Sequence, residues 1–219
     1  MKRIVIIAAC LLLGYAVNAQ QQGLVYTATP LQLTKGSRFF FDRFVRGFII
    51  DTKGVLIKKP GYFFNYDKMS GGLLLRTGKE PVMLAQKSDI QSFTLYDDSQ
   101  NAVVFERVPA IDTGRYVQVL VLGLKYKVYK LISTNYVHAN YRTDGVYTEG
   151  NKYDEYVDDS KYYVLNLATN QLQKVSLKLN AFKTAFSAEG DKLDKFIALH
   201  PHDTINDVYL ASLGEFINN

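Results

Sequence analysis

The stretch from Tyr141 to Tyr163 holds the side chains of this 219-residue chain that are best suited to binding or catalysis. It is long, polar and rich in tyrosine, and long loops on a β scaffold are common places for binding sites. Its carboxylates are Asp144, Glu149, Asp154, Glu155, Asp158 and Asp159. Carboxylate oxygens are ligands that calcium prefers, and tyrosine rings beside carboxylates suit a sugar. We predict a binding site formed by Tyr141, Asp144, Tyr153, Asp154, Tyr156 and Asp158.

A hydrolase or lyase acting on a polysaccharide is the alternative function for this stretch. Asp154 and Glu155 are adjacent, so in an extended chain their side chains point to opposite sides and cannot flank one glycosidic bond. Asp154 and Asp158 share a side, which makes them the carboxylates that such an enzyme would use. A third interpretation is a solvated loop whose tyrosines pack on the edge of a sheet.

Elsewhere the sequence predicts no catalytic residue and no metal ligand. It contains no nucleophile elbow, phosphate-binding loop, dinucleotide fingerprint or helical zinc motif. His138 is interpreted as a surface or hydrogen-bonded residue of a strand. His200 and His202 flank a proline in a turn and lack the i, i+4 spacing of zinc enzymes. We expect no cofactor, with calcium on the carboxylates as the one exception.

Short strands between about Leu24 and Leu179 must position these side chains. Turn signals recur every ~8–12 residues, which is typical of an antiparallel sandwich or barrel. Asp51-Thr52-Lys53-Gly54 and Ser70-Gly71-Gly72 are two such turns, the second at the place of a hairpin. Leu124, Tyr126 and Val128 alternate with lysines, so that strand is expected to bury one face. The fold class predicted is mainly β, with an antiparallel body over residues 20–179.

After Asn180 the apolar spacing changes to that of helices. Phe182 and Phe186 fit a short helix capped by Asn180, and a second helix is expected from about Ala188 to Leu199. Thr204 and Asp207 resemble a capping box that opens a third helix. Residues 180–219 are therefore predicted to form a helical tail packed on the β body, without a linker between them.

The first nineteen residues predict export. Lys2 and Arg3 precede an apolar run over residues 4–13, and small residues at 17 and 19 fit a cleavage site before Gln20. This is the layout of a secretory signal peptide, which would place the protein in the periplasm, outside the cell or at the outer membrane. In an alternative reading, Cys10 would be the lipid-anchored first residue of a lipoprotein. No apolar run reaches the ~20 residues of a membrane span.

Composition argues against a nucleic-acid partner. The chain has 26 Lys and Arg against 21 Asp and Glu, and loss of Lys2 and Arg3 lowers the net charge from +5 to +3. Lysines are scattered and form no cationic stripe. Cleavage before Gln20 also removes the single cysteine, and with it any disulfide or thiolate chemistry.

Three segments carry a resemblance to other proteins. GYFFNYDKMSGGLLL, VLVLGLKYKVYKL and GNKYDEYVDDSKYYV resemble blocks of exported β-rich proteins of Bacteroidota-type bacteria that have no assigned function. The resemblance implies export and a β body with helices, and it implies no activity or cofactor. The signal peptide, the β-rich body and the missing catalytic motifs lead us to expect a non-enzymatic binding or structural module of the cell envelope. Its partner would be an envelope protein or a glycan, and its oligomeric state is left open.

Overall fold

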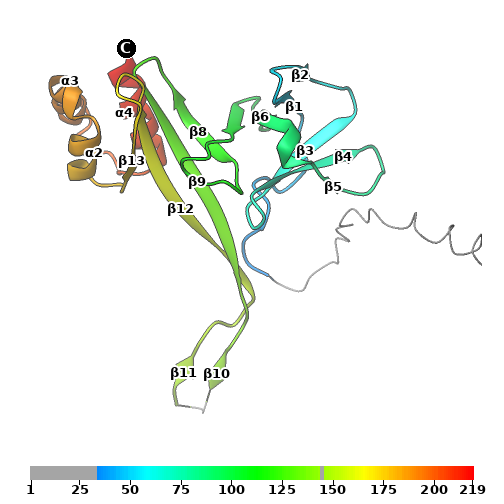
Figure 1. The fold of residues 1–219 in the computed structure, drawn as a ribbon. Coiled ribbons are helices and arrows are strands. Elements are labelled where there is room, and N and C mark those ends of the chain that lie inside the picture. The colour runs from blue at the N-terminus through cyan, green and yellow to red at the C-terminus, as the bar shows by residue number, and fades with distance from the viewer. Residues whose placement is uncertain (1–33, 144–145) are drawn as a thin grey trace, which may run out of the picture.

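The computed structural model describes residues 34–143 and 146–219, and the fold is mainly β (Figure 1). An eight-stranded and a three-stranded antiparallel sheet precede three C-terminal helices. This confirms the predicted fold class, an antiparallel β body with a helical C-terminal tail. The predicted signal peptide (residues 1–19), Cys10, the start of the β body and Asp144 lie outside the described residues.

The large sheet has the strand order β13-β12-β9-β8-β7-β6-β1-β2. Its strands are β1 Gly47–Asp51, β2 Leu56–Ile57, β6 Ile90–Tyr96, β7 Ala102–Glu106, β8 Val117–Leu122, β9 Tyr126–Val137, β12 Glu155–Asn166 and β13 Gln171–Val175. The small sheet contains β3 Tyr62–Asp67, β4 Gly72–Thr77 and β5 Met83–Leu84, and a separate hairpin contains β10 Arg142–Thr143 and β11 Thr148–Glu149. The predicted turns are confirmed, since Gly54 has a φ of 79° and residues 68–71 join β3 to β4.

An aromatic core fills the space between the small sheet and strands β1, β6 and β7. The rings of Tyr66 and Phe105 stack at 4.6 Å between centroids, and those of Phe93 and Phe105 at 5.0 Å. Tyr116 meets the ring of Phe93 edge-on at 4.9 Å. Because these side chains are almost fully buried, they give this half of the molecule a core of its own.

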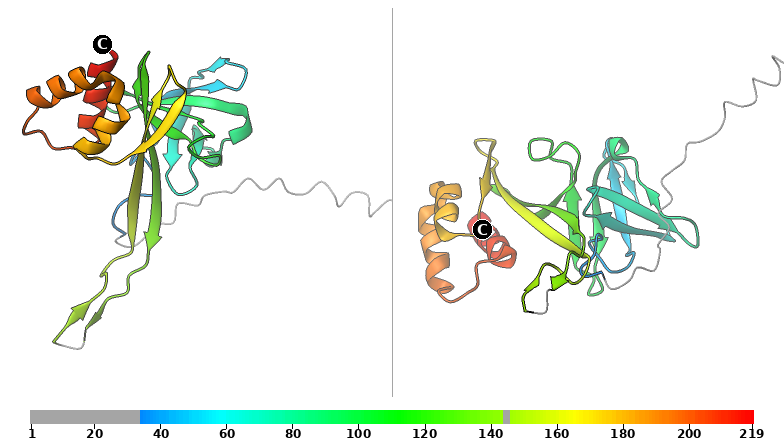
Figure 2. Two further views of the ribbon diagram at one scale, coloured as in Figure 1. Left: turned by 60° about the vertical axis from the view of Figure 1, so that its left-hand side comes forward. Right: turned by 90° about the horizontal axis from the view of Figure 1, so that it is seen from below.

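Three helices cover one face of the other half of the sheet (Figure 2). They are α2 Leu179–Ala185, α3 Gly190–Leu199 and α4 Asp207–Asn218, and short 3₁₀ turns lie at Lys87–Asp89 and Ser187–Glu189. Leu210, Leu213 and Ile217 form a fully buried stripe on α4. Gly214 lets α4 approach β8 and β9, since a Cβ there would lie 3.0 Å from Val121 and Val128. Within the described residues, no helix is long and apolar enough to cross a membrane.

Two helix starts and one strand face differ from the sequence predictions. The side chain of Asn206, not Thr204, caps α4 by accepting a bond from the backbone N–H of Tyr209. Helix α2 begins one residue before Asn180, which therefore does not cap it. Leu124, expected on a buried face, is 93% exposed because it lies in the turn between β8 and β9 rather than in a strand.

The stretch expected to be one long loop is largely strand. β12 begins at Glu155, and it pairs along its whole length with β9, from Val137 opposite Glu155 to Tyr126 opposite Asn166. Beyond Val137 the two chains continue into the β10–β11 hairpin. We call residues 138–153 the arm, and its described strands project away from the sheets and helices in Figure 1 and in the left view of Figure 2.

A register shift separates the arm from the ribbon that carries it. Val137 lies opposite Glu155, whereas Arg142 lies opposite Glu149. The outgoing chain thus advances five residues between these pairs and the returning chain six. One extra residue in a β ribbon makes a bulge that bends the strand and re-aims nearby side chains. Asp154 lies in this irregular section.

Candidate functional site

The base of the arm gathers aromatic rings around one carboxylate. The Tyr136 hydroxyl donates a hydrogen bond to Asp154, and the backbone N–H of Ala139 donates a second one at 2.7 Å. The Tyr136 ring lies 4.9 Å from the rings of both His138 and Tyr156, measured between centroids. His138 is also 3.9 Å from Asp154, with its side chain 82% exposed. We call Tyr136, His138, Asp154 and Tyr156 the arm-base cluster.

The hydrogen bond between Tyr136 and Asp154 shifts the pKa values of both side chains from their ordinary values. Donation by the Tyr136 hydroxyl, with help from the Ala139 N–H, lowers the pKa of Asp154. The same bond raises the pKa of Tyr136, because the phenol proton is shared with a carboxylate. At neutral pH Tyr136 is therefore a neutral donor and Asp154 a charged acceptor. This arrangement suits a structural contact better than a general base.

The beginning of the described chain supports the cluster from the side. Lys35 donates its backbone N–H to the Asp154 carbonyl and accepts the Tyr156 N–H, each at 2.9 Å. Gly36 follows with a φ of 72°, and a Cβ there would lie 2.6 Å from the Tyr156 carbonyl oxygen. The Lys35 amine lies 5.0 Å from the centre of the Tyr153 ring. Residues near 35 and near 154, far apart in sequence, thus form one local unit.

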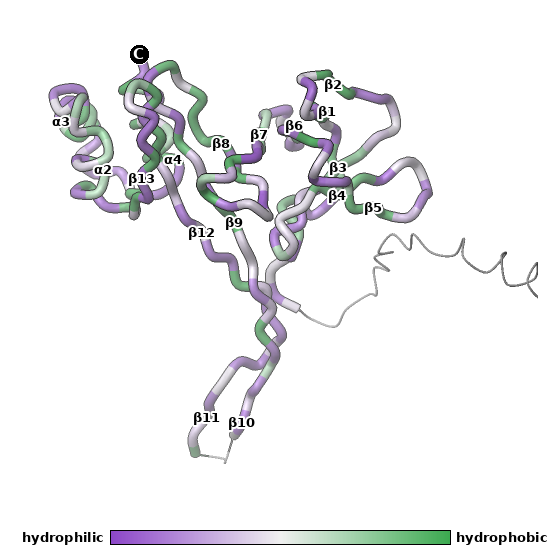
Figure 3. The backbone as a smooth tube through the Cα atoms, in the orientation of Figure 1, coloured by the Kyte–Doolittle hydropathy of each residue, from purple (hydrophilic) through white to green (hydrophobic). Residues whose placement is uncertain are grey.

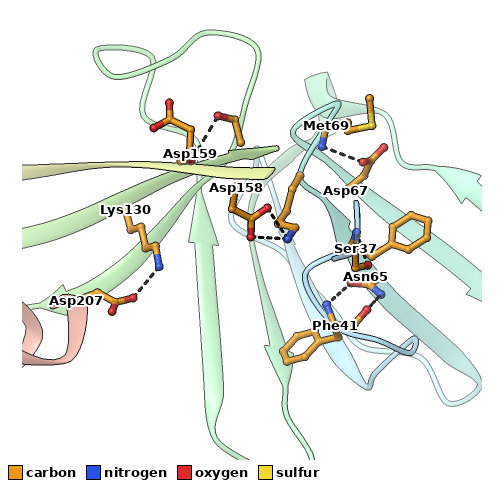
Figure 4. A network of polar contacts seen from close by, with 12 residues as sticks. Ser37, Phe41, Asn65, Asp67, Met69, Lys130, Asp158, Asp159 and Asp207 are labelled. Atoms are coloured by element: carbon orange, nitrogen blue, oxygen red, sulfur yellow. Dashed lines mark hydrogen bonds and ion pairs between the residues drawn. The ribbon is translucent and has the colours of Figure 1, made fainter. Parts of the chain in front are cut away.

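Asp158 lies in a different environment, at the junction between the two halves of the molecule. Both of its oxygens accept from the Lys68 amine at 2.7 Å, and only 9% of the Lys68 side chain is exposed. Lys68 belongs to the β3–β4 turn, which faces Asp158 in Figure 4. The backbone carbonyl of Lys68 accepts from Arg115 and from the Thr134 N–H. Asp158 therefore joins β12 to the smaller sheet.

A buried carboxylate beside this contact holds the same turn in shape. Asp67 is fully buried and accepts a two-point contact from Arg38, at 3.2 and 2.6 Å. It also accepts from the Met69 N–H at 3.0 Å and the Ser70 hydroxyl at 2.9 Å. Because each oxygen has two donors, its buried charge is compensated. The segment after residue 34 and the β3–β4 turn are fixed together through Asp67.

The outer arm carries a shallow hollow that the sequence did not predict. Asn140, Arg142, Glu149 and Gly150 line it, and its volume is about 410 Å³. We call it the arm hollow. Tyr141, from the predicted site, is 40% exposed nearby, and the Lys152 amine lies 5.2 Å from the centre of its ring. The strands of the arm are mostly hydrophilic (Figure 3).

The predicted site residues are thus divided among three places. Tyr153, Asp154 and Tyr156 meet at the arm base, Tyr141 is further out on the arm, and Asp158 is at the junction. Asp144 lies outside the described residues. Sequence reasoning missed Tyr136 as the partner of Asp154; the available signal was period-two spacing, which puts Tyr136 and His138 on one face of a strand. It also missed the opposed pair Arg142 and Glu149, for which a hairpin prediction around Gly145 was the available signal.

The described part of the chain contains no evident cluster of metal-ligating side chains. No group of three or more His, Cys, Asp or Glu side chains lies together there in a way that could hold a metal ion. Asp154 and Asp158 are held by Tyr136 and Lys68 instead. The calcium site therefore stays a prediction from sequence alone.

A larger hollow of about 480 Å³ lies where α3 meets α4. His200 Nδ1 lies 2.8 Å from Asp203, and the His200 ring stacks on Phe196 at 4.3 Å. Asn206, on its rim, caps α4. His200 and Asp203 contact each other where α3 ends, and Asn206 accepts from the Tyr209 N–H where α4 begins, which agrees with the interpretation of His200 and His202 as turn residues.

Comparison with known proteins gives no relative from which a role could be inferred. No protein-family model, no curated protein and no solved structure gives a significant match. The candidate site therefore rests on its own geometry.

Proposed function

We propose that this chain is an exported, non-enzymatic binding protein of the cell envelope, and that the arm carries its contact surface. The arm is the observation that carries the proposal. A two-stranded hairpin is marginally stable on its own in water, so a projecting one gains from contact with a partner. Val146 and Tyr147 near its end are 81% and 76% exposed. The signal-peptide layout of residues 1–19 supports export.

The carboxylates of the alternative, a polysaccharide hydrolase or lyase, are engaged in the fold. Asp154 accepts from Tyr136 and Ala139, and Asp158 accepts from the buried Lys68 amine. A general acid needs a pKa raised toward neutrality, whereas the pKa of Asp154 is lowered. These features favour binding over hydrolysis as the role of the region.

A crosslinked pull-down from native envelopes, read by mass spectrometry, tests the proposal. The tagged full-length chain should recover one envelope component in near-stoichiometric amount. A variant in which Asn-Gly replaces residues 140–152 should lose this component, because it lacks most of the arm. Its fold can be kept, since a two-residue hairpin turn can join Ala139 to Tyr153. Circular dichroism and the melting temperature verify that the shortened variant keeps its fold. Equal recovery by both proteins would refute the arm as the contact surface.

Point variants distinguish specific binding by the arm from non-specific binding by exposed apolar side chains. Tyr147→Ser removes an exposed apolar ring from the arm, and Leu56→Ser removes an exposed apolar side chain from β2, where Leu56 is 57% exposed. We expect recovery to fall with Tyr147→Ser and to be unchanged with Leu56→Ser. A loss with both would mean that recovery depends on exposed apolar area rather than on the arm.

A further inference from the structure

The structure also points to the class of ligand that the arm takes. Resting on the proposed function, we propose that the arm hollow binds a neutral sugar unit of a glycan chain, with Arg142 and Glu149 engaging its hydroxyl groups. Asn140 completes the polar lining, and Tyr147, two residues before Glu149 in the sequence, offers an exposed ring on the same arm.

The hairpin register places these groups on one face. Arg142 and Glu149 lie directly opposite each other across the β10–β11 pair, and opposed residues of an antiparallel pair point to the same side. Asn140 is two residues before Arg142, so in an extended chain it shares that side. All three line the arm hollow. A guanidinium, a carboxylate and an amide therefore face one space.

Gly150 lets Asn140 pack closely against the returning chain in the lining of the hollow. Its φ is 85°, and a Cβ there would lie 2.6 Å from the backbone carbonyl and the side-chain oxygen of Asn140. Any other residue would be strained and would push Asn140 aside. Two contacts fix Asn140 next to Asn151: its side-chain oxygen accepts the Asn151 N–H at 2.7 Å, and its own N–H donates to the Asn151 carbonyl at 3.0 Å.

The pair of opposite charges selects a neutral ligand rich in hydroxyls. Glu149 offsets the attraction of Arg142 for an anion, and Arg142 offsets that of Glu149 for a cation, so neither kind of ion gains a net charge attraction. A hydroxyl group both donates and accepts, so neighbouring hydroxyls can accept from the guanidinium and donate to the carboxylate at once. A sugar ring offers such pairs along its edge. The hollow, at about 410 Å³, falls within the roughly 300–1,000 Å³ of small-molecule sites.

Tyr147 adds the apolar contact that a sugar needs. It is two residues before Glu149 in the sequence, and it is 76% exposed. The apolar face of a sugar ring packs on an aromatic ring while its edge hydroxyls bond elsewhere. An open polar hollow beside an exposed ring suits one unit of a longer chain rather than an enclosed small ligand.

NMR titration of the mature chain with neutral hexasaccharides (cellohexaose, maltohexaose and mannohexaose) tests the inference. We expect at least one to shift arm amide signals with a dissociation constant near 1 mM, about 4 kcal/mol of binding free energy. Arg142→Gln and Glu149→Gln should each weaken binding about tenfold, because each removes a charge-assisted hydrogen bond. Lys152→Gln, which changes a charge beside Tyr141 on the same arm, should bind like the parent protein.

Three results would overturn the inference. They are no shift with any neutral hexasaccharide up to about 10 mM, binding that both Gln variants leave unchanged, or binding only to an acidic oligogalacturonate. The envelope pull-down separates this from the proposed function. An arm-dependent protein partner without sugar binding refutes the sugar ligand and leaves the arm as the contact surface. Recovery that is independent of the arm refutes the proposed function itself.

Discussion

Lys68 is a nearly buried lysine whose charge is balanced by Asp158. Its side chain is 9% exposed, and its amine contacts both oxygens of Asp158. We expect Asp158→Asn to lower the free energy of unfolding by about 1–3 kcal/mol, since a buried ammonium loses its counter-charge. The value stays below that of a fully buried pair because 48% of the Asp158 side chain is exposed. Urea unfolding followed by circular dichroism measures it.

The neighbouring residue provides the control for that change. Asp159 and Lys161 form an exposed pair at 3.4 Å, with side chains 51% and 45% exposed. Asp159→Asn should therefore change stability by less than about 0.5 kcal/mol. If the two Asp→Asn variants were equally stable, the contact between Lys68 and Asp158 would not hold the junction together.

Tyr136 should control the ionisation of Asp154. Because donation by the Tyr136 hydroxyl is the main cause of the lowered pKa of Asp154, Tyr136→Phe should raise that pKa toward its ordinary value. Carbon NMR of the carboxyl group across an acid titration measures the change. Tyr156→Phe, which removes a different hydroxyl from the same cluster, should leave the pKa of Asp154 where it is. An unshifted pKa in Tyr136→Phe would mean that the Ala139 N–H dominates.

The carboxylates could be selected from sequence, but their partners could not. Composition and polarity alone directed attention to Asp154 and Asp158. Their partners are Tyr136, eighteen residues earlier, and Lys68, ninety residues earlier. Lys68 reaches Asp158 only because the β3–β4 turn folds against β12, and no local pattern encodes that long-range contact. A structural and a functional carboxylate therefore look alike in the sequence.

At the scale of elements, one asparagine joins the last helix to the sheet. Asn218 accepts from the backbone N–H groups of Lys125 and Tyr126, at 2.9 and 3.0 Å, and donates to the Tyr126 carbonyl at 3.1 Å. Gly123 leaves the room for it, since a Cβ there would overlap the Asn218 side chain. Gly123→Ala should therefore cost about 1–3 kcal/mol by breaking these bonds.

Gly190 is the matched control for Gly123. It begins α3 with helical angles, and nothing lies within 4 Å of a Cβ built there. Gly190→Ala should be neutral or stabilising by about 0.5 kcal/mol, because alanine has less freedom in the unfolded chain. Thermal melts of the two variants compare them directly. Destabilisation by Gly190→Ala as large as that by Gly123→Ala would contradict the steric argument.

The start of α4 tests a cap that local sequence reasoning misplaced. Asn206→Ala should lower the free energy of unfolding by about 1 kcal/mol, because the Tyr209 N–H loses its acceptor. Thr204→Ala should have a much smaller effect. Urea melts of both variants decide between the caps, and a larger loss with Thr204→Ala would restore the capping box. Both residue types cap helices well, so only the place where the chain turns selects between them.

Strand prediction succeeded where one face is buried and failed where neither is. Tyr126 and Val128, which alternate with lysines in the sequence, are 3% and 0% exposed on the buried face of β9. The first half of β12 was expected to be loop. Val157, Asp158 and Asp159 are exposed, so no apolar alternation marks the strand. Its regularity comes from pairing with β9, a tertiary interaction that outweighs the local polarity of the residues.

The described part of the molecule has two large cores on one sheet, joined at a polar junction, and a smaller cluster around Val117, Tyr129 and Leu131. The aromatic core lies at β1, β6 and β7, and the helical core at β8, β9, β12 and β13. The sequence indicated the β body and the helical tail, since both follow from periodicity. It gave no sign that the body divides into two cores, or that a ribbon extends beyond them as an arm. Those features depend on the pairing of strands distant in sequence.

Buried phenols make the whole fold sensitive to alkali. Tyr66, Tyr116 and Tyr129 are at most 2% exposed. Burial raises the pKa of all three, that of Tyr116 to about 12, and a hydrogen bond to Glu106 further raises that of Tyr129. In the unfolded chain these phenols ionise near pH 10. Their contribution to stability is therefore complete below about pH 10 and is lost as the pH rises through the folded values.

The slope of that loss is the measurable quantity. Each phenol that ionises only on unfolding lowers the free energy of unfolding by about 1.4 kcal/mol per pH unit, so three give roughly 4 kcal/mol per unit above pH 10. Urea midpoints between about pH 9 and pH 12 should fall steeply, together with the rise in tyrosinate absorbance. Tyr129→Phe should reduce the slope by about 1.4 kcal/mol per pH unit, because it removes one of these protons. A slope that Tyr129→Phe does not change would mean that this phenol ionises without unfolding, and that the core around it opens to solvent.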